Sequence, residues 1–140
     1  MVRSYIDSNV WITAVQCEPE AARRAFVVLD DPQREILFSD LVRLETLPKP
    51  RFHCRQREVE ALEALFEAAG KLPLEDPAIF QLAVDTAARH DLQPMDALHV
   101  AISQHFGIDE FVTFEKPTKP IFRVAGIKVL SLHLEKGAGA

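Results

Sequence analysis

The sequence predicts an α/β protein, a three-layer α/β/α sandwich with a mainly parallel sheet, on three observations. Short apolar runs typical of strands alternate with segments whose apolar residues recur at helical spacing. The 140 residues are 48% hydrophobic and 26% charged, as in ordinary globular domains, and a chain of this length can bury a core without disulfides. No internal repeat is present, so we expect one domain over residues 1–140, with a frayed tail at 137–140.

The N-terminal part is expected to alternate between strand and helix. The first strand is expected at residues 2–6, and Ser8 or Asn9 can cap the helix that follows it. A second helix is expected over residues 20–29. Residues 36–38 form a short apolar run that indicates the next strand.

Serine and proline residues set the limits of the next elements. Ser39 can cap a helix that must end near Pro48, and Pro48 together with Pro50 indicates a loop. An amphipathic helix should follow, ended by Gly70, because apolar residues recur at helical spacing opposite a row of glutamates. Its apolar positions are Val59, Leu62, Phe66 and Ala69.

Residues 55–106 read as helix after helix, which indicates a helical insertion between strands. Asp76 and Pro77 form a cap followed by a proline at the first helical position. The helix after them has a predicted apolar face of Phe80, Ala83, Val84 and Ala87 and a solvated face of Gln81, Asp85 and Arg89. Pro94 opens a further helix to about Phe106, and residues 111–113 and 128–130 are the last strand candidates.

Two acidic residues directly follow predicted strands. Asp7 comes after the first strand, and ligands of open parallel sheets bind beyond such strand ends. Glu115 lies just past the strand at residues 111–113. The structural alternatives are that Asp7 belongs only to a turn, where Asp is common, and that Glu115 is an exposed loop acid beside Lys116.

A third acid, Glu45, lies on the apolar side of the helix that Ser39 begins. Leu41 and Val42 are four and three residues before it, so the three side chains share a face. A carboxylate in that position should be paired, protonated or bound to a metal ion. The alternative is a glutamate at the edge of the buried stripe that reaches water.

The fourth acid, Asp96, lies on a helix that is nearly all apolar and therefore buried. Asp96, His99 and Ser103 make one polar stripe along this helix, which is typical of a site or a hydrogen-bond network. The alternative for Asp96 is a first-turn acid that favours the helix dipole. For His99 we expect a core histidine bonded to the backbone rather than a metal ligand.

The four acids together indicate a metal site. Carboxylates about 5 Å apart repel each other by roughly 3 kcal/mol at an effective dielectric near 20, so a cluster of them needs a cation. Hard oxygen ligands favour Mg²⁺ or Mn²⁺. The candidate catalytic and metal-binding residues are Asp7, Glu45, Asp96 and Glu115.

The order of these motifs resembles the PIN-domain family. YIDSNVWI, SDLVRLETL, LQPMDALHVAIS and FVTF followed by Glu115 resemble its four acidic motifs, and FRVAGIKVL resembles its usual ending. The resemblance implies neighbouring strands bearing Asp7 and Glu115, and it implies cleavage of single-stranded or looped RNA by metal-activated water. It also implies that Asn9 and Thr113 hold the carboxylates in place. This chain departs from the family in having Glu rather than Asp at position 115, before a loop with two prolines.

The resemblance also implies partners and a location. Many small bacterial members are VapC-like toxins that pair with an antitoxin and form homodimers, and we expect a cytoplasmic protein without a membrane span. The two cysteines give neither a disulfide framework nor metal-ligand spacing, and the N-terminus does not resemble a signal peptide.

Charge is distributed unevenly. The net charge of −5 counts against nucleic-acid binding, yet residues 49–57 carry four basic side chains and no acid. This basic loop is a candidate RNA contact, and the alternatives are a solvated loop or a surface that faces an antitoxin. The candidate RNA contacts are Lys49, Arg51, Phe52, Arg55 and Lys116, with Lys119 and Arg123 also placed to face phosphates.

Two other functions compete with the nuclease. A catalytically inactive PIN-like module could bind RNA or a partner protein, but all the core acids are present. A phosphatase of the haloacid dehalogenase type would need a second Asp two residues after Asp7, where this chain has Asn9. No glycine-rich phosphate loop indicates nucleotide binding.

Overall fold

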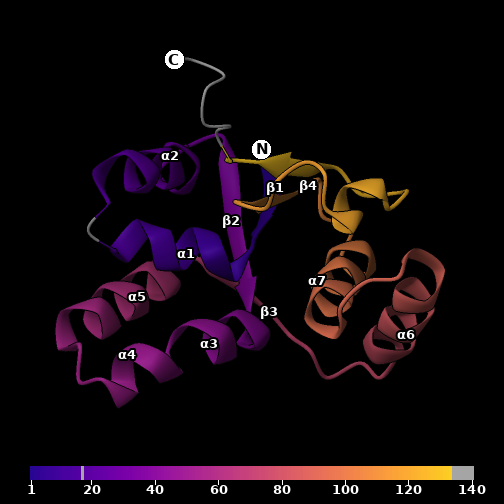
Figure 1. Ribbon diagram of the computed structural model, residues 1–140, viewed down its shortest axis with the longest axis horizontal. Helices are drawn as coiled ribbons and strands as arrows, with labels where there is room; N and C mark the ends of the chain where they lie inside the picture. The colour runs from indigo at the N-terminus through magenta and orange to yellow at the C-terminus, as the bar shows by residue number, and fades with distance from the viewer. Residues whose placement is uncertain (17, 134–140) are drawn as a thin grey trace.

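A five-stranded parallel sheet forms the centre of the computed structural model, which describes residues 1–16 and 18–133 (Figure 1). The strand order is β3-β2-β1-β4-β5, and every adjacent pair is parallel. This confirms the predicted α/β class, and residues 137–140, expected to fray, lie outside the described residues. The strands are β1 (Val2–Ile6), β2 (Arg34–Ser39), β3 (Gly70–Leu72), β4 (Glu110–Thr113) and β5 (Val129–Ser131).

Helices flank both faces of the sheet. Figure 1 shows α1, α2 and α5 on one side of it and α6 and α7 on the other. None of the helices in the described part of the chain is long and apolar enough to cross a membrane. The helices are α1 (Ser8–Val15), α2 (Pro19–Leu29), α3 (Asp40–Thr46), α4 (Pro48–Phe52), α5 (Gln56–Ala68), α6 (Ala78–His90), α7 (Pro94–His105) and the 3-10 helix η1 (Pro120–Arg123).

One face of the sheet packs against α7. Tyr5 on β1 is in register with Leu37 on β2 and Phe111 on β4, so the three side chains share that face. The Tyr5 ring lies 5.5 Å from the His99 ring of α7 and 5.8 Å from the Phe111 ring, centroid to centroid. All of these side chains are buried, which fixes α7 against the centre of the sheet.

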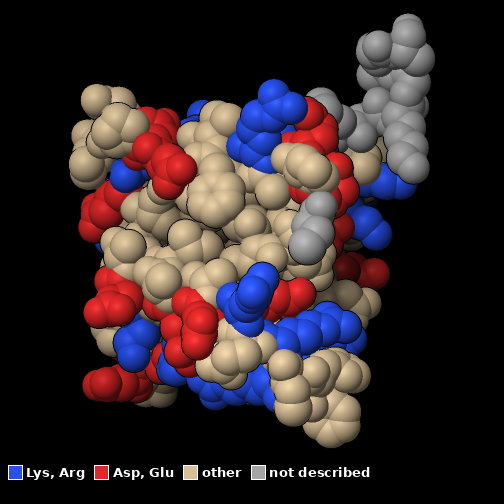
Figure 2. Space-filling model, turned by 90° about the vertical axis from the view of Figure 1, so that its left-hand side faces the viewer, with Lys and Arg blue, Asp and Glu red and all other residues tan. Residues whose placement is uncertain are grey.

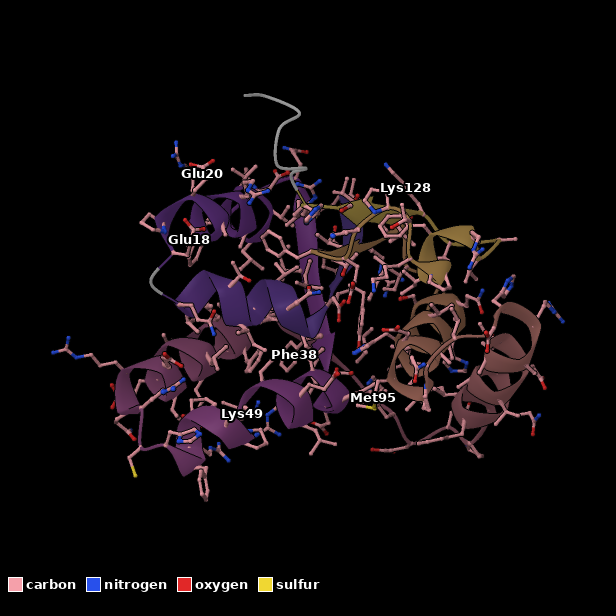
Figure 3. The ribbon with its side chains drawn as sticks, viewed as in Figure 1. Glu18, Glu20, Phe38, Lys49, Met95 and Lys128 are labelled. Atoms are coloured by element: carbon pink, nitrogen blue, oxygen red, sulfur yellow. The ribbon has the colours of Figure 1, made fainter. Side chains whose placement is uncertain are left out.

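The opposite face carries an aromatic cluster. Phe38 follows Leu37 and therefore points to the other side of β2, toward the helices drawn on the left in Figure 3. Its ring stacks on Phe66 of α5 at 4.7 Å, and Trp11 of α1 contacts the same Phe66 at 4.9 Å. The cluster joins two helices to the sheet.

The sheet topology brings two distant chain segments together. β1 is central, and the chain turns to β2 and β3 on one side before β4 and β5 extend the sheet on the other. Ile6 is in register with Val112, and the Asp7 N–H donates to the Val112 carbonyl at 2.9 Å. As expected, the strands before Asp7 and Glu115 are neighbours, so the residues that follow them emerge side by side at the edge where ligands bind.

The structure corrects one predicted loop and gives a predicted helix-ending glycine a second role. The predicted loop at Pro48 and Pro50 is the helix α4, because the first-turn N–H groups of a helix have no partner within it and a proline loses nothing there. Gly70 does more than end α5, since it begins the short strand β3. A Cβ at Gly70 would come within 2.8 Å of the Leu37 Cδ2 atom, so any larger residue there would force the Leu37 side chain to shift.

Side-chain roles also differ from two expectations. The cap of α1 is Asp7, which accepts from the Ser8 N–H, rather than Ser8 or Asn9. The buried face of α6 is Ile79, Ala83 and Thr86. Phe80 and Val84, predicted on the apolar face, are 59% and 62% exposed because α7 covers only part of that face.

The aromatic cluster should dominate stability on its side of the sheet. We expect Phe66→Ala to lower the free energy of unfolding by about 3–5 kcal/mol, because the cavity would open beneath both Phe38 and Trp11. Phe52→Ala is a matched control, since Phe52 is 81% exposed, and it should change stability by about 0.5 kcal/mol or less. Urea denaturation measures both values, and equal effects would contradict the assignment of the core.

Candidate metal centre

Asp7 is the innermost acid of the site. It lies between β1 and α1, and only 8% of the residue is exposed. Its Oδ1 accepts from the Ser8 N–H at 2.7 Å, and its Oδ2 accepts from the Thr113 hydroxyl at 2.7 Å. Burial raises the pKa of Asp7 above its usual value, although the nearby His99 and these hydrogen bonds act to lower it.

A small network from α1 and β4 supports this carboxylate. Asn9 donates from its amide to the Thr113 hydroxyl oxygen at 3.2 Å and accepts from the Phe114 N–H at 3.1 Å. The Glu115 N–H also donates to the Thr113 oxygen, at 3.1 Å. Thr113 therefore accepts twice and donates its one proton to Asp7, which fixes the direction of that bond. Asn9 and Thr113 lie where the sequence predicted groups that hold a carboxylate in place.

Glu45 reaches the same region from α3. Its Oε1 accepts from the Ser8 hydroxyl at 2.6 Å and lies 2.6 Å from the Nε2 of His99. Partial burial acts to raise the pKa of Glu45, but the contacts with His99 and Ser8 outweigh it and hold the pKa below its usual value. Glu45 is thus an ionised group, with 26% of its side chain exposed.

His99 joins this site although its role was predicted differently. It is 1% exposed, and its ring bonds two side chains, Glu45 through Nε2 and the Tyr5 hydroxyl through Nδ1 at 2.9 Å. The expectation of a histidine bonded to backbone was wrong. Tyr5 also bonds the Ser39 hydroxyl at 2.7 Å, and burial raises the pKa of Tyr5 far above its usual value. The stripe that His99 forms with Asp96 was the sequence signal for its position.

Asp96 completes the group from the first turn of α7. Its pKa is raised by partial burial and then by the negative charges of Asp7, Glu115 and Glu45. The structure therefore places Asp7, Glu45 and Glu115 close enough to Asp96 to oppose its ionisation. Asp96 and Glu115 also line one cavity together with Lys119.

The donor set fits a hard divalent cation. One ligand atom each from Asp7, Glu45 and His99 lies within 4.8 Å of the others. The surrounding donors are mostly carboxylate oxygens, which Mg²⁺ and Mn²⁺ prefer. Burial raises the pKa values of Asp7 and Asp96, and the negative charges of neighbouring acids act in the same direction. A bound cation would offset both effects.

The candidate RNA contacts fall into two regions. Lys49 and Arg55 line a groove that includes Glu45, so basic side chains border the acidic site. Figure 2 faces the side that carries α4, and Lys and Arg side chains gather in its lower part. Arg51 is held by Glu63 at 2.8 Å and lies outside that groove, while Lys116 is exposed in the loop after β4.

Known proteins share the sequence pattern and the fold of this chain. A model of the PIN domain matches residues 4–119. Similar solved structures are VapBC2 from Rickettsia felis bound to a DNA fragment from its promoter (10% identity, TM-score 0.74, covering 93% of this chain and 98% of that one) and a toxin–antitoxin complex from Klebsiella pneumoniae (17%, 0.71, 94% and 99%). A third is VapC20 from Mycobacterium tuberculosis, a sarcin-ricin loop cleaving toxin (18%, 0.65, 89% and 95%). These identities show a shared fold, and a comparison with curated proteins found no match.

Charge repulsion in the site should make metal-free stability depend on pH. Because the folded pKa of Asp96 is raised above 3.8, the folded state holds this proton more tightly than the unfolded state does. Its contribution to stability is therefore present at low pH and is lost as pH rises through the raised value. We expect the melting temperature of Asp96→Asn to fall less than that of the wild type between about pH 4 and about pH 7. At neutral pH the variant should melt at or above the melting temperature of the wild type. Thermal melts with EDTA measure both values.

The same melts with Mn²⁺ test whether Asp96 binds metal. A ligand at a hundredfold excess over Kd stabilises a protein by about 2.7 kcal/mol, and Asp96→Asn should lose most of that gain. Asp85→Asn, at an exposed acid on α6, is the matched control and should keep it. If the wild type gains nothing and metal-free Asp96→Asn is strongly destabilised, Asp96 is a structural residue.

Proposed function

This chain belongs to the PIN-domain family, and from that premise we propose that it is a metal-dependent ribonuclease that cleaves single-stranded or looped RNA. The observation that carries the proposal is the convergence of four acids from β1, α3, α7 and the end of β4 at one edge of the sheet. Burial and neighbouring negative charges raise the pKa values of Asp7 and Asp96, which a bound cation would offset. The four acids are Asp7, Glu45, Asp96 and Glu115.

We assign the metal to Asp7, Glu45 and Asp96, with Glu115 as a fourth acid. A Mg²⁺ or Mn²⁺ ion held there would lower the pKa of a coordinated water and offset charge that develops on the scissile phosphate. Thr113 holds Asp7 by donating its proton to Oδ2, and Asn9 orients Thr113. The contribution of the protein is a set of carboxylates fixed before substrate arrives.

The groove beside Glu45 supports a path for the RNA backbone. Lys49 and Arg55 line it, and phosphates that contact them would lead toward the acidic site. Lys49 lies on α4, below Phe38 in the view of Figure 3. Phe52, at the end of the same helix, is 81% exposed and available to stack on a base. A local basic surface of this kind can bind RNA although the net charge is −5.

We further propose that the protein is a VapC-like toxin with an antitoxin partner, and that it forms a homodimer. Two of the similar structures are toxin–antitoxin complexes, from Rickettsia felis and Klebsiella pneumoniae, and a third similar protein is a sarcin-ricin loop cleaving toxin. The basic loop could then face either RNA or the antitoxin. Co-purification with the product of the neighbouring gene would test the partner.

The nuclease proposal predicts strictly metal-dependent cleavage. With Mg²⁺ or Mn²⁺ the wild type should cleave a single-stranded RNA with looped segments, and EDTA should stop it. Asp7→Asn should reduce the rate on the order of 100-fold or more, because it removes one negative ligand from the site. Asp85→Asn should keep full activity, and circular dichroism should show all variants folded. RNA binding by the wild type without cleavage at any metal concentration would favour the inactive PIN-like module.

The groove proposal predicts a change in salt dependence. Each phosphate contact on a single strand contributes about 0.7 to the slope of log K against log salt, so Lys49→Ala with Arg55→Ala should flatten that slope by roughly 1.4. Arg89→Ala with Lys128→Ala removes the same charge from exposed positions elsewhere and should leave the slope unchanged. Fluorescence anisotropy with the Asp7→Asn background measures binding without cleavage. Equal slopes for both double variants would mean that the basic loop is a solvated surface that does not contact RNA.

A further inference from the structure

We propose that Tyr5 is a positioning residue for Glu45 and acts through His99, an inference that rests on the proposed metal-dependent function. Four side chains form a hydrogen-bonded chain behind the candidate metal centre. Ser39 lies 2.7 Å from the Tyr5 hydroxyl, Tyr5 lies 2.9 Å from His99 Nδ1, and His99 Nε2 lies 2.6 Å from Glu45 Oε1. We call these four residues the relay.

The direction of each hydrogen bond in the relay can be worked out from the Glu45 carboxylate at one end of it. An ionised carboxylate can only accept, so His99 must carry its proton on Nε2 to bond Glu45. When the ring is neutral, Nδ1 is an acceptor, Tyr5 donates to it and the Tyr5 oxygen accepts from Ser39. Each hydroxyl thus fixes the next group, and the last one fixed is the Glu45 carboxylate.

Because most of the relay is buried, its hydrogen bonds depend on protein side chains and not on water. Tyr5 and Ser39 are 0% exposed and His99 is 1% exposed, so bulk water does not reach these three members of the relay to replace a lost partner. Removing the Tyr5 hydroxyl would leave His99 Nδ1 without its donor in the described structure. The ring would then keep one hydrogen bond, to Glu45, instead of two, so its orientation toward the carboxylate would be less firmly held.

The relay also determines which oxygen of Glu45 is available. Both His99 and Ser8 bond Oε1, and among the described residues no hydrogen bond reaches Oε2. His99 Nε2 is 3.8 Å from the nearer Asp7 oxygen, too far for a hydrogen bond, so it is Glu45 that the ring holds. The carboxylate is therefore anchored through one oxygen and keeps the other for a cation.

Ser39 has no competing local role that would explain its orientation. It occupies the N-cap position of α3, where a serine usually accepts from a backbone N–H, and we expected it to cap that helix. Its side chain makes no such bond and turns to Tyr5 instead. A capping interaction is thus replaced by a contact with Tyr5, whose other side-chain hydrogen bond among the described residues is to His99.

Calorimetric titration with Mn²⁺ alone tests the relay without any assay of cleavage. Tyr5→Phe removes one hydroxyl and keeps the ring, and we expect it to weaken Mn²⁺ binding about tenfold, as loss of an outer hydrogen bond to a metal ligand commonly does. Ser39→Ala should weaken binding in the same direction. Ser103→Ala is the matched control, because it removes a buried hydroxyl on α7 that bonds only the His99 carbonyl, and it should leave the Kd unchanged.

His99 variants separate a positioning role from direct ligation and from a general loss of packing. His99→Gln keeps a side-chain donor and should bind Mn²⁺ more tightly than His99→Leu, whose binding should be weakened but still measurable. In the His99→Leu background, Tyr5→Phe should have no further effect on the Kd, because the path from Tyr5 to Glu45 is already broken. Full additivity of the two changes would refute the relay.

The outcomes also separate this inference from the proposed function. If the wild type binds Mn²⁺ and both Tyr5→Phe and Ser39→Ala stay within about twofold of it, the relay is refuted and the metal centre stands. If the wild type binds no Mn²⁺, both proposals fail. Should Tyr5→Phe not fold, Ser39→Ala at the far end of the relay gives the same decision.

Discussion

The hydrogen bonds that hold the Asp7 carboxylate between β1 and α1 connect the fold to the site. Asp7 accepts from the first N–H of α1 and from the Thr113 side chain at the end of β4, so it joins a helix start to the neighbouring strand. The same burial that makes these bonds strong opposes the charge they need, and it raises the pKa of Asp7. The helix, the strand pair and the acidic centre therefore all depend on how that charge is compensated.

Much of the fold and the placement of the acids follow from local patterns. A carboxylate directly after an apolar strand of a parallel sheet lies at the edge where ligands bind, and this pattern predicted that position for Asp7 and for Glu115 separately. Helical spacing similarly indicated that Glu45 and Asp96 face inward. The order of β1 and β4 in the sheet came from family resemblance, because strand pairing depends on contacts far apart in sequence.

The relay and the face of α6 were beyond the reach of those patterns. The partners of His99 depend on which side chains α7 meets across the sheet, and no spacing on one helix contains that information. Likewise, an apolar stripe shows what a helix can bury but not how wide its neighbour is, so Phe80 and Val84 stay exposed beside a groove with Leu98. The short strand β3 is only three residues long, too short for any periodicity.

The chemical identity of the clustered side chains favours a cation over a purely structural network. Asparagine or glutamine could accept the same hydrogen bonds from Ser8, Thr113 and His99 without charge repulsion. Carboxylates at about 5 Å oppose one another by roughly 3 kcal/mol, which a small domain has little stability to offset. Glu45 is nevertheless held ionised by its partners while Asp7 and Asp96 are pushed toward the proton, so the site combines one fixed negative charge with two that a cation would restore. A divalent ion would stabilise this cluster of carboxylates. A surface that bound only RNA would instead be weakened by the same carboxylates, because they repel phosphates.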